Sequence, residues 1–211
     1  MFEVKDRVGT ARSGTLSGEN WQFETPGIEF INTDRFPAPE KARPLPDKDE
    51  VRTLDKSIEL YQDPKIFIEE LIKFREQIGH QAPLFLPSTA LPNNLALLVY
   101  LGADILDSSR AALLSSEGYF LTPDGAWPAD DISQDECGCR GCDESLYHHN
   151  MLALQTELHR VRGHISRGTL REFVEYRAKT SPRLVELLRI LDTQHYNFQE
   201  KRCPVKGSNF R

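Results

Sequence analysis

The sequence has none of the long apolar runs that mark a membrane or exported protein. No apolar stretch reaches the roughly 20 residues that a helix needs to cross a bilayer. The opening residues, MFEVKDRVGT, also lack the apolar core of a signal peptide. We therefore expect a soluble, cytoplasmic protein with no membrane partner.

Cysteine is scarce, and its placement is uneven. The chain has 4 cysteines, of which three lie close together at Cys137, Cys139 and Cys142. A disulfide framework would spread its cysteines to close larger loops. In a reducing compartment such a cluster is more typical of a metal site. Its compact spacing also disfavours the alternative of three free or redox-active thiols.

The segment Cys-Gly-Cys-Arg-Gly-Cys predicts a structural zinc site. Its two glycines allow the backbone to fold back so that the three thiols converge. Zn²⁺ prefers four ligands in a tetrahedron, and three thiolates with one imidazole leave no place for an activated water. The nearest candidates for the fourth ligand are His148 and His149, and the more distant ones are His159, His164 and Cys203.

Charge is distributed unevenly although the net charge is only -6. Residues 158–211 contain 12 Lys and Arg against 5 Asp and Glu, a balance of +7, which leaves -13 for residues 1–157. One interpretation is a set of solvated helices. The other is that the basic C-terminal part faces a polyanion such as RNA.

The middle of the chain predicts a parallel strand–helix–strand unit. Leu84–Leu86 and Ala103–Leu106 are short apolar runs, and a helical pattern over residues 95–101 lies between them. Asp107 follows the second run, at the end of the strand where reacting groups gather in α/β barrels. The alternative for Asp107 is a plain aspartate that caps a turn.

Other segments predict strands before this unit and helices around it. Apolar residues among turn signals indicate short strands within residues 1–31. Asp63 as a cap, Pro64 in the first turn and Gly79 as a stop bound one helix. Apolar side chains at spacings of three and four predict further helices that begin near Met151, Leu170 and Pro182.

Several of these segments resemble the tRNA-guanine transglycosylase family. The three cysteines followed by His149-Asn150 resemble its zinc site. Residues 2–30 resemble its opening strands, residues 91–111 the segment with its aspartate nucleophile, and residues 147–177 the helices after its zinc site. The amino-acid sequence of residues 97–104 and 200–205 is most similar to the transglycosylase-like module of archaeosine synthases.

The resemblance implies roles for particular residues. It implies that tRNA is the partner, that His149 is the fourth zinc ligand, that Asp107 is the nucleophile and that Arg110 binds the substrate. It also implies base exchange by double displacement, in which a carboxylate attacks the ribose C1′ atom before the deazaguanine base replaces guanine.

The chain departs from the family in length and in motifs. A full (β/α)8 barrel takes roughly 250 residues, so this chain is too short, and the missing part falls between Phe36 and Pro83. The family's Asp-Ser-Gly-Gly-Phe-Gln motif, which carries a second catalytic aspartate, is absent. Asp104 lies three positions before Asp107 and faces the other side of the strand. Glu24 and Asp34 are still weaker candidates for the second catalytic carboxylate.

We therefore predict an α/β fold in three parts. Residues 1–135 form a shortened, transglycosylase-like barrel portion with N-terminal strands, residues 136–195 a helical zinc-binding subdomain, and residues 196–211 a polar tail. One functional hypothesis is a tRNA-modifying subunit of a split enzyme in archaeosine- or queuosine-type biosynthesis. A second chain would then supply the missing barrel, lysine-transfer or PUA domains, with a homodimer as another assembly. The alternative is a noncatalytic, zinc-stapled module that binds tRNA or scaffolds a partner.

Overall fold

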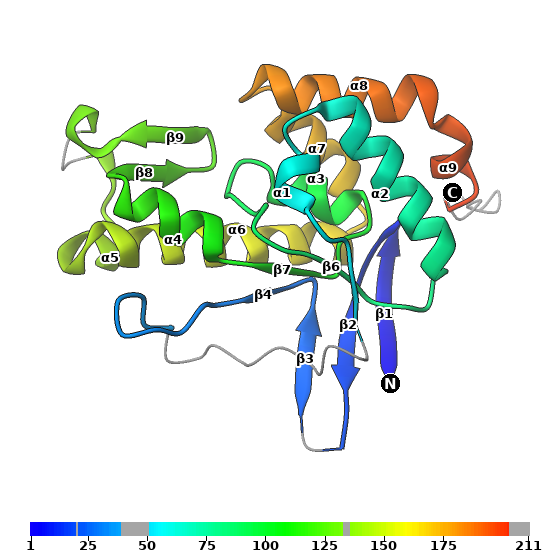
Figure 1. Ribbon diagram of the computed structural model, residues 1–211, viewed down its shortest axis with the longest axis horizontal. Helices are drawn as coiled ribbons and strands as arrows, with labels where there is room; N and C mark the ends of the chain where they lie inside the picture. Colours follow the sequence, from blue (N-terminus) through cyan, green and yellow to red (C-terminus); the bar gives the residue numbers. More distant parts are fainter. Residues whose placement is uncertain (20, 39–50, 133–135, 203–211) are drawn as a thin grey trace.

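A computed structural model describes residues 1–19, 21–38, 51–132 and 136–202. It confirms a mixed α/β architecture with three separate sheets (Figure 1). Most of the Pro-rich segment 36–50, Cys203 and the end of the predicted tail lie outside the described residues. Among the described helices, none combines the length and the apolar character needed to cross a membrane.

The N-terminal sheet is an antiparallel meander. It contains β1 (Phe2–Val8), β2 (Ala11–Ser17) and β3 (Gln22–Thr25) in that order. Leu16 and Phe23 on its inner face are buried against Ile105 of the parallel sheet. The meander therefore covers one face of the sheet that carries Asp107.

The second sheet is parallel and has four strands. They are β4 (Gly27–Glu29), β5 (Arg52–Thr53), β6 (Leu84–Leu86) and β7 (Ile105–Asp107), in the order β4-β7-β6-β5. The predicted strand–helix–strand unit is confirmed, because α3 (Leu95–Tyr100) joins the parallel strands β6 and β7. In the described residues the first strand of this sheet pairs with the last, which the sequence did not predict.

The third sheet is the hairpin of β8 (Tyr119–Thr122) and β9 (Gly125–Pro128), followed by the short helix η1 (Ala129–Asp131). The remaining helices follow the sheets in chain order: α1 (Ser57–Leu60), α2 (Pro64–Ile78), α4 (Ser109–Ser116), α5 (Arg140–Glu144), α6 (Leu146–Ser166), α7 (Leu170–Ala178), α8 (Pro182–Gln194) and α9 (Tyr196–Glu200).

The predicted limits of α2 are confirmed. The Asp63 side chain accepts hydrogen bonds from the amides of Lys65 and Ile66, Pro64 opens the first turn, and the helix ends at Ile78. Gly79 then takes φ +73, a left-handed value that favours glycine. Local capping chemistry in the sequence is thus sufficient to set this helix.

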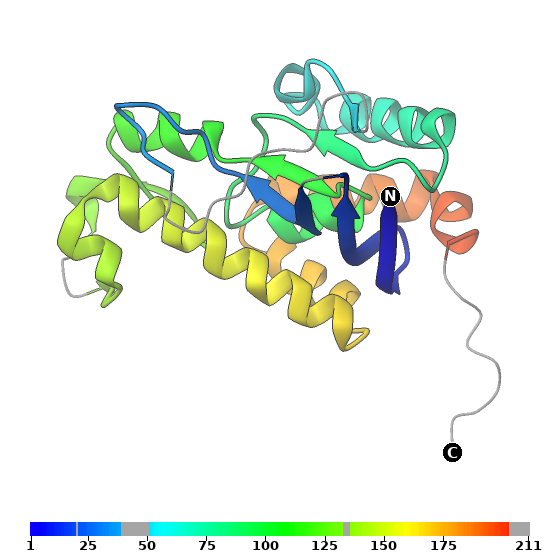
Figure 2. The ribbon, with the colours of Figure 1, turned by 90° about the horizontal axis from the view of Figure 1, so that it is seen from below.

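One apolar core joins the parallel sheet to the C-terminal helices. Leu86 and Leu98 belong to the same buried cluster as Leu154 of α6 and Leu187 of α8. Figure 2 shows the parallel sheet between α2 on one side and α6 on the other. Because this core crosses residue 135, the division into a barrel portion and a zinc-binding subdomain stays a prediction.

Two buried ion pairs lie within this packing. Asp104 accepts hydrogen bonds from Arg12, whose Nε atom is 2.7 Å from Oδ1, and the Arg75 guanidinium lies 3.6 Å from Oδ2. Glu157 of α6 binds Arg177 of α7 through contacts of 2.6 and 2.9 Å. A buried charge is tolerated only with such partners, so Asp104 serves the core and is not available to Asp107.

Candidate functional site

Three thiols and one imidazole meet between α5 and α6. The Nδ1 atom of His149 lies 3.3 Å from the Sγ atoms of Cys139 and Cys142, and 3.6 Å from that of Cys137. The Sγ atoms of Cys139 and Cys142 are 3.6 Å apart. The four ligand atoms lie within 4.8 Å of one another, so the cluster could hold a metal ion.

The spacing of these atoms fits zinc. Zn–S bonds of about 2.3 Å and Zn–N bonds of about 2.0 Å in a regular tetrahedron place two sulfurs roughly 3.8 Å apart, and a sulfur and a nitrogen roughly 3.5 Å apart. The observed contacts of 3.3 and 3.6 Å are close to both values. The donor set and its geometry therefore agree.

A glycine allows the cysteine turn to pack against α6. A Cβ atom on Gly141 would lie 2.8 Å from backbone atoms of His148 and His149, so a larger residue would push the turn away from the helix. Around Gly138, by contrast, the described residues leave open space. Of the two glycines in the motif, Gly141 is the one whose lack of a side chain brings the thiols to the imidazole.

His149 is held by a contact on its other ring nitrogen. Its Nε2 atom lies 2.9 Å from the carbonyl oxygen of Leu121 in β8, and its ring stacks on Phe120. Burial lowers the pKa of His149, against a smaller opposing effect of the Leu121 carbonyl. A neutral imidazole that donates from Nε2 leaves the Nδ1 lone pair for a metal.

The other candidate ligands have different surroundings. His148 lies 2.8 Å from the Ser145 hydroxyl and 3.3 Å from a Glu144 carboxylate oxygen. His164 is 2.8 Å from the Thr169 hydroxyl, and His159 is exposed on α6. The structure brings the imidazole of His149, and not that of His148, to the three thiols.

Asp107 lies at the C-terminal end of β7, as the sequence predicted. Its carboxylate accepts hydrogen bonds of 3.0 Å from the amides of Ser88 and Ser109. Ser88 takes φ +56, a left-handed conformation that costs energy for a residue other than glycine and that concentrates at functional sites. Burial raises the pKa of Asp107, while the bonds from Ser88 and Ser109 lower it. The side chain is buried, with an exposed fraction of 5%.

Arg110, in the first turn of α4, points toward a tyrosine. Its guanidinium carbon lies 5.4 Å from the centroid of the Tyr61 ring. Among the described residues, its buried Nη1 atom has no hydrogen-bond partner. Burial lowers the pKa of Arg110, and the nearby Arg183 adds to this effect. A buried, unsatisfied N–H group is costly, and an anion or water would satisfy it.

The structure adds a carboxylate that sequence reasoning missed. Glu29 at the end of β4 is the register partner of Asp107 at the end of β7, and the Ser108 amide donates to its carbonyl oxygen. Lateral partners on parallel strands point to the same face and have backbones about 4.8 Å apart. The sequence analysis did not separate Gly27–Glu29 from the earlier strands, although Pro26 precedes it. Its pairing with β7 could not have been inferred in any case, because sequence spacing does not show which strands pair.

Comparison with known proteins places this chemistry in a family. The family described as Queuine tRNA-ribosyltransferase matches residues 56–183, more than half of the 211 residues. The chain belongs to the tRNA-guanine transglycosylase family. This confirms the resemblance that the motifs indicated. The matched residues include Asp107, Arg110 and the four clustered metal-ligand candidates, whereas Glu29 lies outside them.

Individual relatives within the transglycosylases point the same way. An archaeosine synthase of Haloferax volcanii is 35% identical over 149 residues, which cover 67% of this chain and 25% of the relative. An archaeosine synthase subunit alpha of Methanosarcina acetivorans is 33% identical over 162 residues, with coverages of 69% and 26%. One of Thermoplasma acidophilum is 28% identical over 223 residues, with coverages of 98% and 40%. The chain thus spans about a quarter of the length of the first two relatives.

Proposed function

We propose that this chain is the transglycosylase-like subunit of a split, tRNA-modifying enzyme in archaeosine- or queuosine-type deazaguanine biosynthesis. Three relatives carry the name archaeosine synthase, two of them as subunit alpha. The chain covers a minor part of each of these relatives. In this proposal a second chain supplies the remaining domains. The observation that carries the proposal is the strand-end carboxylate of Asp107, fixed by two backbone amides.

The parallel sheet supports a cut-down barrel. In a closed β/α barrel the first strand pairs with the last, and β4 pairs with β7 in this way. The remaining neighbours, β6 and β5, continue the wall. We propose that residues 1–135 are the shortened barrel portion, residues 136–195 the metal-binding helices and residues 196–211 the tail. In this proposal the barrel is open between β4 and β5, the two edge strands of the described sheet.

We further propose that Cys137, Cys139, Cys142 and His149 bind one structural Zn²⁺. The atoms that would ligate it converge at tetrahedral spacing, and their chemistry is the thiolate and imidazole set that zinc prefers. Such an ion would supply folding energy and would join β8, the cysteine turn and α6. It would leave no position for a metal-bound water, so it would not take part in the base exchange.

In the proposed reaction Asp107 forms the covalent bond. Its carboxylate attacks the ribose C1′ atom, and the C1′–N bond breaks with its electron pair on the departing base. Glu29 as a carboxylic acid donates a proton to that base. The incoming base then attacks C1′, the bond between C1′ and the Asp107 carboxylate breaks with its electron pair on Asp107, and the Glu29 carboxylate accepts the proton that the incoming base loses. The carboxyl groups of retaining glycosidases lie about 5–5.5 Å apart, which is the scale of the β4–β7 strand separation. Arg110 would bind an anionic group of the substrate.

The low exposure of Asp107 supports the second candidate function. At 5% exposure the carboxylate cannot contact a ribose in this conformation. The second candidate is a noncatalytic, zinc-stapled module that binds tRNA or scaffolds a partner. Asp107 would then cap the turn before α4, and the sheet edge would not have to open to expose its carboxylate. In the split enzyme, by contrast, the partner chain would have to open this edge of the sheet.

A base-exchange assay separates the two functions. Labelled guanine is incubated with tRNA, the chain and the co-purified partner, and radioactivity in the tRNA is measured. The enzyme hypothesis expects incorporation that falls at least about 10³-fold in Asp107→Asn, because a covalent step is lost. It expects a fall of about 10²-fold in Glu29→Gln. The exposed pair member Glu24→Gln is the matched control. Absence of exchange by the wild-type complex would leave the noncatalytic module as the function.

A further inference from the structure

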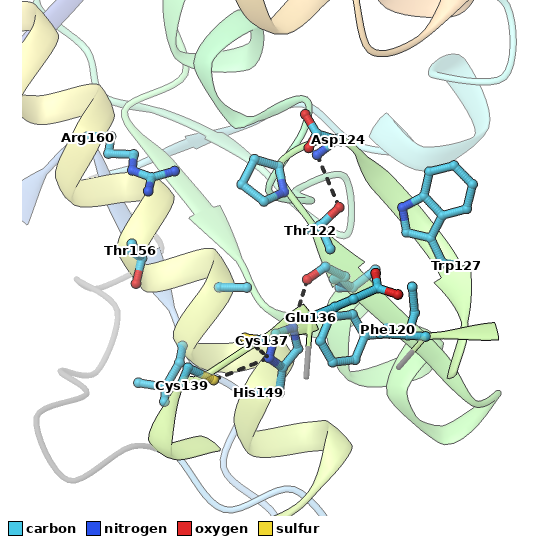
Figure 3. Close-up of a pocket in the computed structure, with 15 residues that line it drawn as sticks. Phe120, Thr122, Asp124, Trp127, Glu136, Cys137, Cys139, His149, Thr156 and Arg160 are labelled. Carbon is cyan, nitrogen blue, oxygen red and sulfur yellow. Dashed lines mark hydrogen bonds between the residues drawn. The ribbon is translucent and has the colours of Figure 1, made fainter. Parts of the chain in front are cut away.

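A groove lies between the β8–β9 hairpin and α6 and plays no part in the proposed reaction. Its volume is about 670 Å³, and one end is bounded by the metal cluster at Cys137, Cys139 and His149. Figure 3 shows Phe120 and Trp127 on the hairpin side and Thr156 and Arg160 on the helix side. Asp107 and Arg110 are not among the residues that line it.

The lining of this groove is apolar yet open to solvent. Phe120, Leu152 and Ala153 are half-buried along its walls. The Trp127 side chain is 47% exposed at its edge. Tryptophan is enriched among the residues that dominate binding energy at protein interfaces. An indole in this position, beside an apolar floor, is a typical anchor for a partner.

The shape of the groove suits an elongated occupant. The α6 residues along it are His149, Leu152, Ala153, Thr156 and Arg160, which share one helix face. At 1.5 Å per residue this face is roughly 16 Å long, or about three helical turns. Amphipathic helices bind in apolar grooves of this kind through residues at helical spacing.

The charge around the groove excludes a nucleic acid and selects a cation-rich partner. Residues 124–144 contain 7 Asp and Glu against 1 Arg, a balance of -6. The acidic residues of this segment that the structure describes are all exposed, and two of them, Asp124 and Glu136, line the groove itself. The single basic lining residue, Arg160, is at the far end and pairs with Glu157 at 3.3 Å. Phosphates would be repelled here, whereas Lys and Arg side chains would be attracted.

We propose that this groove docks a basic, amphipathic segment of about three helical turns from a different protein. Its apolar residues would contact Phe120, Leu152 and Trp127, and its Lys and Arg side chains would face Asp124 and Glu136. This surface is separate from the Asp107 edge, and the proposal holds whether or not the chain catalyses base exchange.

Trp127 provides a direct reporter of occupancy. The chain has 2 tryptophans, so the variant Trp21→Phe retains Trp127 alone. Three probes are titrated into the zinc-loaded, full-length variant: a helical peptide of Lys, Leu and Ala, the same peptide with Glu in place of Lys, and a 12-nucleotide oligouridylate. The expected result is a saturable blue shift of the emission with the Lys peptide alone.

Variants then test the site and the charge separately. Ala153→Lys should lower the affinity for a fluorescein-labelled Lys peptide by roughly tenfold or more, because it places a charge in the apolar floor. Asp124→Asn, at an acidic lining residue, should lower it about twofold to fivefold. The matched controls are Tyr176→Ala, which removes an aromatic side chain that is 60% exposed on α7, and Glu172→Gln on the same helix. Neither control should change the affinity, and zinc content confirms that each variant is folded.

Four outcomes would overturn the proposal. They are no response of Trp127 to the Lys peptide, an equal response to the Glu peptide, a response to the oligouridylate, and equal losses in the control variants. A blue shift that grows with protein concentration without peptide would also overturn it, because a second copy of the chain would then occupy the groove. The base-exchange assay is unaffected by any of these results, so failure of this proposal and failure of the proposed function can be told apart.

Discussion

The metal lobe, residues 119–145, and the C-terminal helices α7 and α8 are stabilised in different ways. In the described part of the metal lobe, Leu121 is the one buried apolar side chain, whereas α7 and α8 bury nine. A segment with so little apolar burial cannot offset its own conformational entropy. The comparison gives a physical reason for the proposed metal at one end of α6, where little apolar surface is buried, and for the hydrophobic core at the other.

The metal lobe also differs in charge from the C-terminal part of the chain, residues 158–211, which includes α7 and α8. The metal lobe is strongly acidic, whereas residues 158–211 carry the balance of +7. Several of these cations are engaged within the molecule, since Arg177 binds Glu157, Arg171 binds Asp192 and Arg162 binds Glu24. The exposed basic residues in the described part are Arg160, Arg167, Lys179, Arg189 and Lys201. The charge count of a sequence therefore overstates the basic surface available to RNA.

The largest expected effect breaks the metal lobe alone. Cys139→Ala should lose the metal and unfold residues 119–145, because zinc binding supplies their folding energy. Hydrogen exchange should lose protection there, by more than about 3 kcal/mol of local stability, while α7 and α8 keep theirs. His148→Ala, next to the cluster but not in it, is the control. Equal zinc content in Cys139→Ala and wild type, measured by atomic spectroscopy, would contradict the metal assignment.

The second effect breaks the helical side instead. Arg177→Met removes the buried partner of Glu157 and leaves it only the contact of 3.3 Å with the exposed Arg160, so it should lower the free energy of unfolding by about 3 kcal/mol. Zinc content should not change, since this pair is remote from the cluster. The exposed pair member Glu175→Gln should cost less than about 1 kcal/mol. Chemical denaturation measures both, and equal losses would show that burial does not distinguish the two pairs.

A smaller effect concerns Asp107 and depends on pH. Because its pKa is raised by burial, folding favours the protonated form. Its stabilising contribution is fully present below the ordinary pKa of an aspartate side chain and is lost as pH rises through the raised folded pKa. At pH 7, Asp107→Asn should therefore raise the free energy of unfolding, because a neutral amide avoids burying a charge, and the gain should be smaller at pH 3.5. A gain of the same size at both pH values would contradict this origin.

The smallest effect tests the charge contrast through tRNA binding. Arg167→Gln and Lys179→Gln should each weaken tRNA binding only a few-fold and reduce its salt dependence, because each removes one phosphate contact at most. The metal-lobe change Asp143→Asn is the control and should not weaken binding. Filter binding at several salt concentrations measures this, and a flat salt response of the wild type would exclude the C-terminal helices as the tRNA surface.

Short-range patterns account for what the sequence predicted correctly. Asp63, Pro64 and Gly79 set the limits of α2, and the runs at Leu84 and Ile105 gave two parallel strands. The spacing of the three cysteines indicated their convergence, which the structure shows. Helix capping, turn formation and the alternation of apolar and polar residues each involve only a few neighbouring residues. They can therefore be predicted from a short segment without the rest of the chain.

The tertiary structure alone decided which distant groups meet. The Leu121 carbonyl holds the Nε2 atom of His149, so that Nδ1 faces the thiols, and the pairing of β4 with β7 makes Glu29 the register partner of Asp107. Tertiary packing also buries Arg177 against Glu157. A count of charges in the sequence cannot distinguish this buried arginine from an exposed one. These contacts depend on packing between segments far apart in the chain, and no local spacing encodes that packing.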